Sequence, residues 1–325
     1  MLLAAAAVVI GLVILVWGAD RFVLGAAGLA HSLGISPLLI GLTVVGFGTS
    51  APEILISTIA ALEGSPGIAI GNALGSNIAN IALILGTTAV FVPLTMKSDI
   101  LRREYPLLLA VTVGAYLLLR DGNLGREDGA MLLAGLVLTM LMLVRIGLQR
   151  QNHDPLAEEM ETKIPSNLST LAATAWFLIG LTALIIGSRL LVWGAIEVAV
   201  MLGVSELVIG LTIVAIGTSL PELAAAIMSA VRGEHELAIG NVVGSNIWNL
   251  LVVLGIPGLL APGIIPTDVV QRDMPVLLVL TSALFVMGYS FKGHGTINRL
   301  EGSLLLVSFV AYQGWVMWQT PATTV

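Results

Sequence analysis

The sequence predicts an all-α polytopic membrane protein with ten transmembrane helices, arranged as two inverted five-helix repeats. Three observations lead to this fold class: an apolar composition, ten long apolar segments and a duplicated pair of motifs. Hydrophobic residues make up 57% of the 325 and charged residues 10%, and the mean hydropathy is +1.00. Soluble domains are usually about one quarter charged. The chain therefore has too few charges to cover a water-facing surface.

The charge balance and residue types exclude several functions. A net charge of −6 with 14 scattered Lys and Arg residues leaves no basic patch for nucleic acid. The lack of cysteine removes disulfides, thiolate metal sites and thiol catalysis. No phosphate loop, nucleophile elbow or H-E-x-x-H pattern occurs, so the sequence holds no motif for ATP-driven pumping or hydrolysis.

Apolar segments long enough to cross a hydrocarbon core of about 30 Å recur along the chain. They lie near residues 1–24, 36–62, 67–92, 104–120, 128–148, 169–193, 205–231, 236–261, 272–291 and 299–318. The only long hydrophilic stretch, 149–168, divides them five and five. We therefore expect a first repeat at 1–148, a linker at 149–168 and a second repeat at 169–325.

The two halves repeat each other at an offset of 169 residues. Residues 36–53 match 205–222 at 12 of 18 positions, and 69–80 match 238–249 at 9 of 12. The paired Gly, Asn, Ser, Pro and Glu residues in one register indicate an internal duplication. Five spans is an odd number, so the second half enters the membrane with opposite orientation, as in many secondary transporters.

Lys and Arg residues give the expected orientation. With the N-terminus outside, ten of them fall on the cytoplasmic side and four on the outer side. Because cytoplasmic loops carry an excess of Lys and Arg, we expect both termini outside and the linker in the cytoplasm.

Polar residues at depth mark the candidate site. Glu53 and Glu222 each lie about 17 residues into a predicted span, where a carboxylate costs at least about 2.5 kcal/mol. Pro52 and Pro221 interrupt the helices beside them and free backbone carbonyls. Unpaired backbone in a membrane is tolerated where it lines a cavity. With the neighbouring hydroxyls, such a break forms an oxygen-rich cage that suits hard cations such as Ca²⁺ and Na⁺.

A second motif, GNxxGSNxxN, occupies 71–80 and 240–249. In a helix, its residues at i, i+4 and i+8 share one stripe. These residues are Asn72, Ser76 and Asn80 in the first half and Asn241, Ser245 and Asn249 in the second. Gly71 and Gly75 would let another backbone approach closely. The alternative is that these small polar residues only pack helices together.

These motifs resemble the two α-repeats of the cation/calcium antiporter superfamily, the sodium/calcium exchanger family. The resemblance rests on GTSAPE at 48–53, GTSLPE at 217–222 and the two GNxxGSNxxN elements, with motif regions at 41–53, 71–80, 210–222 and 240–249. It implies a compact prokaryotic inner-membrane protein. Its second, third, seventh and eighth spans would surround a midplane site, and its long first and sixth spans would slide across them.

The resemblance also implies roles for individual residues. Glu53 and Glu222 would be the central cation-binding carboxylates. The shell would be completed by hydroxyls, by carbonyls near two threonines and by two amides: Ser50, Ser219, Ser76, Ser245, Thr49, Thr218, Asn80 and Asn249. Several relatives carry Asp at one of the two positions that are Asn80 and Asn249 here. The site would therefore hold two negative charges, which one Ca²⁺ or two Na⁺ neutralise.

The expected function is secondary active antiport of Ca²⁺ against Na⁺ or H⁺ by alternating access. The partners would be inorganic cations and the lipid bilayer, with no enzyme activity, no cofactor and no protein partner. One alternative keeps the fold and exchanges Ca²⁺ for H⁺ or Na⁺ for H⁺. A second is an ion channel or ion-sensing membrane protein. An intramembrane enzyme is the third, although no His lies at depth to act as a base.

Overall fold

The computed structural model describes residues 2–33, 41–62, 64, 66–96, 101–149, 168–201, 215–288 and 295–319. Most of them are helical, as the sequence predicts. The α-helices are α1 (Leu2–Leu33), α3 (Gly46–Thr49), α4 (Ala51–Leu62), α5 (Pro66–Ile78), α6 (Gly86–Phe91), α7 (Leu101–Leu119), α8 (Arg126–Gln149), α10 (Thr170–Met201), α12 (Ala215–Thr218), α13 (Leu220–Val231), α14 (His235–Trp248), α15 (Gly255–Leu260), α16 (Met274–Gly288) and α17 (Arg299–Gln319).

Four π-helical segments and four short strands complete the described elements. The π-helical segments are η1 (Gly41–Val45), η2 (Ala79–Leu85), η4 (Asn249–Val253) and η5 (Val269–Asp273). Strand β1 (Leu94–Met96) pairs antiparallel with β4 (Gly295–Ile297), and β2 (Asn123–Leu124) pairs antiparallel with β3 (Gly263–Ile264). Each strand pair joins one predicted repeat to the other.

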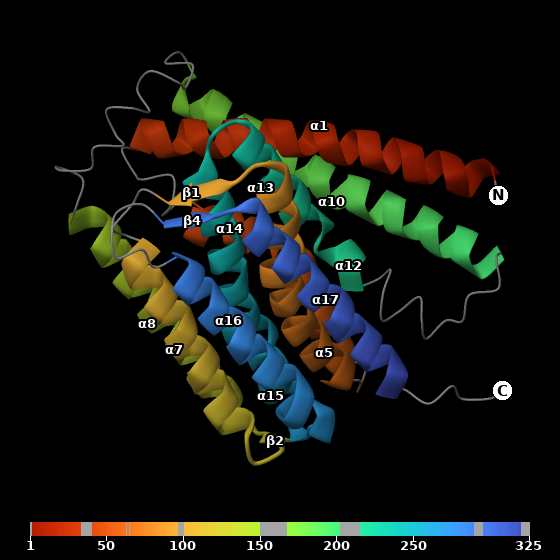
Figure 1. The fold of residues 1–325 in the computed structure, drawn as a ribbon, viewed down its shortest axis with the longest axis vertical. Coiled ribbons are helices and arrows are strands. Elements are labelled where there is room, and N and C mark those ends of the chain that lie inside the picture. The colour runs from red at the N-terminus through yellow and green to blue at the C-terminus, as the bar shows by residue number, and fades with distance from the viewer. Residues whose placement is uncertain are drawn as a thin grey trace.

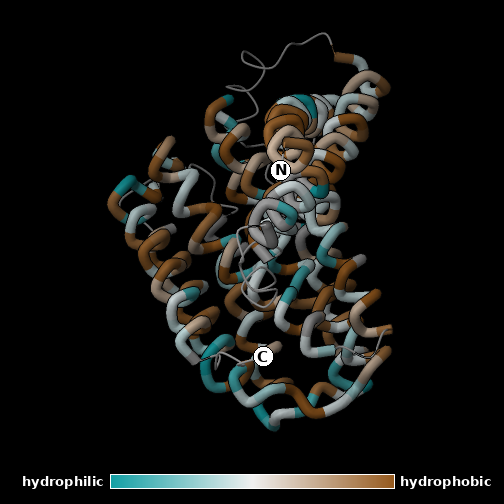
Figure 2. Tube along the Cα trace, turned by 90° about the vertical axis from the view of Figure 1, so that its right-hand side faces the viewer, coloured by the Kyte–Doolittle hydropathy of each residue, from teal (hydrophilic) through white to brown (hydrophobic). Residues whose placement is uncertain are grey.

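The described helices fit a membrane protein. Six are long and apolar enough to cross a bilayer, and the bent pair from Thr43 to Leu62 makes up to seven. Hydrophobic residues occur along most of the length of the long helices (Figure 2). The count of ten spans stays a prediction, because several predicted spans contain residues outside the described ranges. The predicted linker, 149–168, also lies almost entirely outside them.

Helices α1 and α10 form a long pair across one side of the bundle (Figure 1). Glycines allow this close packing, as small residues do between membrane helices. A Cβ atom on Gly25 would lie 2.2 Å from the backbone nitrogen of Phe177, and one on Gly180 would lie 2.3 Å from that of Phe22. The glycines therefore set the separation of the two helices.

The remaining helices form the core of the molecule. The segment from α14 through α15 is the most buried of the candidate spans, with 94% of its most apolar stretch inside the protein. The two halves pack alike here, since α17 lies on α6 as α8 lies on α15. This repetition is what a duplicated sequence predicts.

The α1–α10 pair packs differently on the two halves. Helix α1 packs on α13, whereas no comparable packing of α10 on α4 occurs among the described residues. Met228 of α13 packs against the cluster that contains Phe22. Ile59, the matching residue of α4, is 45% exposed. The α1–α10 pair is therefore displaced towards the second repeat's broken helix.

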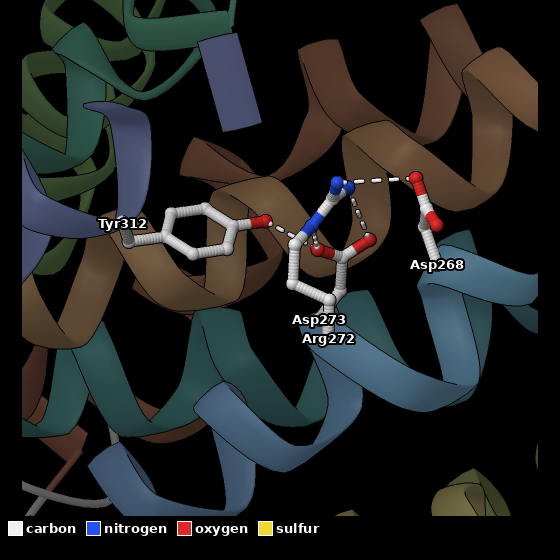
Figure 3. A network of polar contacts seen from close by, with 4 residues as sticks. All are labelled: Asp268, Arg272, Asp273 and Tyr312. Carbon is white, nitrogen blue, oxygen red and sulfur yellow. Dashed lines mark hydrogen bonds and ion pairs between the residues drawn. The ribbon is translucent and has the colours of Figure 1, made fainter. Parts of the chain in front are cut away.

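A polar network fixes the start of α16 against α17 (Figure 3). The Arg272 Nε donates to Asp273 Oδ1 at 2.7 Å, and its Nη1 donates to Asp268 Oδ2 at 3.1 Å. The Tyr312 hydroxyl donates to the same Asp273 oxygen at 2.9 Å. The buried Asp273 is thereby paired and hydrogen-bonded, as a charge in a low-dielectric setting requires.

Candidate cation site

Two helix breaks place the candidate carboxylates. In the first half, α3 ends at Thr49 and α4 begins at Ala51, with a bend of 52° around Ser50. In the second, Ser219 separates α12 from α13. Proline follows each serine within the first turn of the new helix, where its missing N–H needs no intrahelical partner. Glu53 and Glu222 then lie in those first turns.

Both carboxylates are fully buried and lack ordinary partners. Glu53 and Glu222 have no exposed surface. None of their carboxylate oxygens makes a regular hydrogen bond with a described residue. No salt bridge within the described ranges reaches either one. The two carboxylates are also close enough to repel each other. Because buried charge is costly unless it is paired, the site favours a cation.

Each carboxylate faces hydroxyls of the opposite repeat. Thr218 of the second half lies beside Glu53, in a contact looser than a regular hydrogen bond. Thr49 and Ser50 of the first half lie beside Glu222 in the same way, together with Ser245. The site is therefore built from both repeats at once.

Two asparagines hold the helices that carry the carboxylates. Asn72 of α5 donates to the backbone carbonyl of Glu53 at 3.2 Å. Asn241 of α14 makes the same contact with the carbonyl of Glu222 at 3.5 Å. Asn72 also donates to the Ser57 hydroxyl at 3.1 Å. These amides position the broken helices through the backbone, which gives them a structural part in the site.

Further contacts cross between the repeats. The Thr49 hydroxyl donates to Asn241 Oδ1 at 3.0 Å and lies 3.2 Å from the Ser245 hydroxyl. The Asn80 amide donates to Asn246 Oδ1 at 3.0 Å. The backbones also meet, since a Cβ on Gly46 would lie 3.0 Å from the nitrogen of Ser245. These contacts join the halves around the carboxylates.

Several buried oxygens around the carboxylates make no hydrogen bond to the described residues. They are both carboxylate oxygens of Glu53 and Glu222, the hydroxyls of Ser50 and Ser219, and Oδ1 of Asn80 and Asn249. Carboxylate, hydroxyl and amide oxygens are the ligands that hard cations prefer. Among the described residues, no group of three or more His, Cys, Asp or Glu side chains is placed to hold a metal ion, so the carboxylates at this site are two.

The ten residues predicted from sequence lie in the broken helices, α5, α14 and the two π-helical segments that follow them. Nine are buried and Thr218 is half-buried. They are Thr49, Ser50, Glu53, Ser76, Asn80, Thr218, Ser219, Glu222, Ser245 and Asn249. Their roles as ligands stay predictions.

The predicted helical stripe ends where the helix type changes in each half. Helix α5 changes to the π-helical η2 at Ala79, and α14 changes to η4 at Asn249. In the second half, the Asn249 N–H bonds the carbonyl of Ser245, four residues back, so Asn249 lies one regular α-helical turn beyond Ser245, as predicted. The close approach predicted at Gly71 and Gly75 is not seen, because a Cβ there would meet no described atom within 4 Å.

Two further residues, which were not among the predicted site residues, contribute to the site. Asn246 accepts the hydrogen bond of Asn80, and Ser57 accepts that of Asn72. The duplicated Gly-Ser-Asn triplet at 75–77 and 244–246 was the available signal for Asn246. Ser57 has alanine at the matching position 226, so the repeat gave no signal for it.

Comparison with known proteins extends these findings. The family described as sodium/calcium exchanger protein matches residues 3–145 and 172–318. The chain is 47% identical to a candidate antiporter, CaxA, of Alkalimonas amylolytica, over 96% of this chain and 98% of that protein. It is 42% identical to the inner membrane protein YrbG of Escherichia coli, over 99% of each chain.

A solved structure shares the fold. The sodium-calcium exchanger NCX_Mj, soaked with Na⁺ and Ca²⁺, superposes with a TM-score of 0.83 and 32% identity. The match covers 96% of this chain and 97% of that one. The family match spans both halves that the duplication defines, and with them both broken helices. The protein is therefore a membrane transporter that belongs to the sodium/calcium exchanger family.

Proposed function

We propose that the protein exchanges Ca²⁺ for Na⁺ by alternating access, with both ions using the site between Glu53 and Glu222. One observation carries the proposal. Two buried carboxylates without a cationic partner are surrounded by hydroxyl and amide oxygens that make no hydrogen bond to the described residues. Such a cage binds a cation that has lost its water.

Charge explains why the two ions would exchange. The site carries two formal negative charges, which one Ca²⁺ or two Na⁺ neutralise. Both ions together would leave excess positive charge in a low-dielectric setting, which is strongly unfavourable. Occupancy by Ca²⁺ would therefore exclude Na⁺, and the reverse. This mutual exclusion is the condition for coupled exchange at a single site.

The unequal packing of the α1–α10 pair supports alternating access. The pair covers α13 and leaves the matching face of α4 without comparable packing. Since α4 and α13 are repeat counterparts, sliding of the pair would exchange their environments. We place the N-terminus and C-terminus outside, and the 149–168 linker between the two repeats in the cytoplasm, so the two repeats cross the membrane in opposite orientations.

A second candidate function is exchange of Ca²⁺ for H⁺. Asn249 provides an amide where a third carboxylate would favour additional Na⁺. Two mutually repelling, buried carboxylates also offer a proton a site, because one proton removes the repulsion. The proton would then replace Na⁺ as the coupling ion at the same residues.

Calcium uptake into proteoliposomes tests the proposal. The purified protein is reconstituted, and uptake of radioactive Ca²⁺ is driven by an outward Na⁺ gradient, an outward H⁺ gradient or an outward K⁺ gradient. We expect uptake with the Na⁺ gradient and none with K⁺. Uptake only with the H⁺ gradient would select the second candidate. Calcium entry that is equal under all three conditions would indicate a channel and contradict exchange.

A further inference from the structure

An ion pair joins the sliding helix pair to the core. Arg232, the residue after α13, donates from Nε to Asp20 Oδ1 of α1 at 3.0 Å, and its Nη2 contacts the same oxygen. Arg21 lies nearby, with its Nε 3.8 Å from Asp20 Oδ2. The Arg21 guanidinium lies over the rings of Trp17 and Trp176, so aromatic contacts hold it in place.

The ion pair lies at the interface where the halves differ. Ala19, Phe22 and Val23 of α1 belong to the buried cluster that also contains Ala225 of α13. Asp20 is in the same stretch of α1. The bond therefore joins the α1–α10 pair to α13 in the arrangement that the structure describes.

At the positions equivalent to Asp20 and Arg232, the other repeat carries residues of the opposite charge. An offset of 169 residues converts Asp20 of α1 to Arg189 of α10, and it converts Arg232 back to Glu63. Glu63 follows α4 in the sequence and lies outside the described residues. Arg189 is exposed and forms no salt bridge within the described part of the chain. The long helix therefore carries the acidic residue in the first half and the basic residue in the second.

We propose that the Asp20–Arg232 ion pair positions the α1–α10 pair on α13, and that Arg189 has the corresponding role in the opposite conformation. The proposal rests on the alternating access proposed above. The charges make the contact on α13 specific, because Asp20 attracts Arg232 whereas Arg189, at the equivalent position of α10, would repel it. Like charges in the wrong pairing oppose intermediate positions of the helix pair.

Spin-label distances in purified protein test this positioning. The natural chain has no cysteine, so Leu12→Cys and Val231→Cys place one label on α1 and one on the last residue of α13, next to Arg232, both at exposed positions. The key variant is Arg232→Gln, which leaves the Asp20–Arg21 contact in place. Asp20→Arg with Arg232→Asp restores the attraction with reversed charges. Arg189→Gln is the matched variant on α10.

We expect Arg232→Gln and Arg189→Gln to shift the distribution of label distances in opposite directions. The ion pair is about one third exposed, with side chains 30% and 34% exposed, so its loss should change the ratio of the two conformations by about two- to fivefold. Arg232→Gln should enlarge the longer-distance population, the charge-swapped variant should restore the parent distribution, and Arg189→Gln should reduce the longer-distance population. A merely structural role would move both single variants in the same direction.

Two results would overturn the proposal: an unchanged distribution in Arg232→Gln, or shifts of the same sign in Arg232→Gln and Arg189→Gln. Calcium uptake by the cysteine-free parent is measured in parallel. If the parent transports no Ca²⁺ but Arg232→Gln and Arg189→Gln shift the distance distribution in opposite directions, the proposed function is refuted and the ion-pair role is retained. If the parent transports Ca²⁺ but the two variants show no such shifts, the ion-pair role is refuted and the proposed function is retained.

Discussion

Asn249→Asp adds a third carboxylate to the candidate site with almost no change of shape. Asn249 is fully buried, and neither atom of its amide makes a hydrogen bond to a described residue. The substitution therefore breaks no bond. It changes the formal charge from −2 to −3, which three Na⁺ neutralise. Burying the new charge costs several kcal/mol, and binding of a third cation or a proton offsets that cost.

We therefore expect the Hill coefficient for Na⁺ to rise from about 2 towards about 3, a stronger pH dependence, or both. The assay is Ca²⁺ flux in proteoliposomes against Na⁺ concentration at two pH values. Asn80→Asp is the matched variant. It loses the 3.0 Å bond to Asn246, so it should also unfold more easily, by about 1–3 kcal/mol. Superimposable flux curves for the parent and Asn249→Asp would mean that residue 249 does not face the ions.

Two further predictions concern the shell and the long helix pair. Ser50→Ala and Ser219→Ala remove hydroxyls that make no hydrogen bond to described residues, so each should weaken the apparent cation affinity by roughly fivefold, about 1 kcal/mol, and retain transport. Unchanged ion dependence in the double variant would leave these serines a packing role. Gly180→Ala would place a Cβ 2.3 Å from the Phe22 nitrogen and should cost about 1–3 kcal/mol of stability. Gly114→Ala, with no atom within 4 Å, should be neutral or stabilise by up to about 1 kcal/mol, and equal thermal unfolding of the two variants would contradict the glycine packing.

The duplication made much of the site predictable. Residues that are polar, at depth and repeated at the same offset were expected to lie together, and the structure places Glu53 and Glu222 at equivalent breaks. Their role as ligands stays a prediction. The breaks were also predictable, since proline cannot continue a helix without loss. The structure shows that each proline is the second residue of a new helix, and that the break falls at the serine two residues before it.

Other features depend on packing that one sequence does not encode locally. The π-helical turns at Asn80 and Asn249 arise where helices of both repeats meet, and no residue pattern signals them. The choice of Asn246 as partner of Asn80 is likewise a contact between distant halves. Equivalent halves also cannot predict which of two equivalent surfaces the α1–α10 pair covers. Under the proposed alternating access, that choice distinguishes one conformation from the other.

The most direct test of the central claim is Ca²⁺ uptake by Glu53→Gln and Glu222→Gln in proteoliposomes. Each change keeps the shape of the side chain and removes half of the site's charge. Glu127→Gln, at an exposed position in the first turn of α8, is the control. We predict parent-like uptake for Glu127→Gln and no Ca²⁺ uptake for either site variant, with all three proteins monodisperse and folded. Uptake near the parent rate by folded Glu53→Gln or Glu222→Gln would contradict the assignment of the cation site.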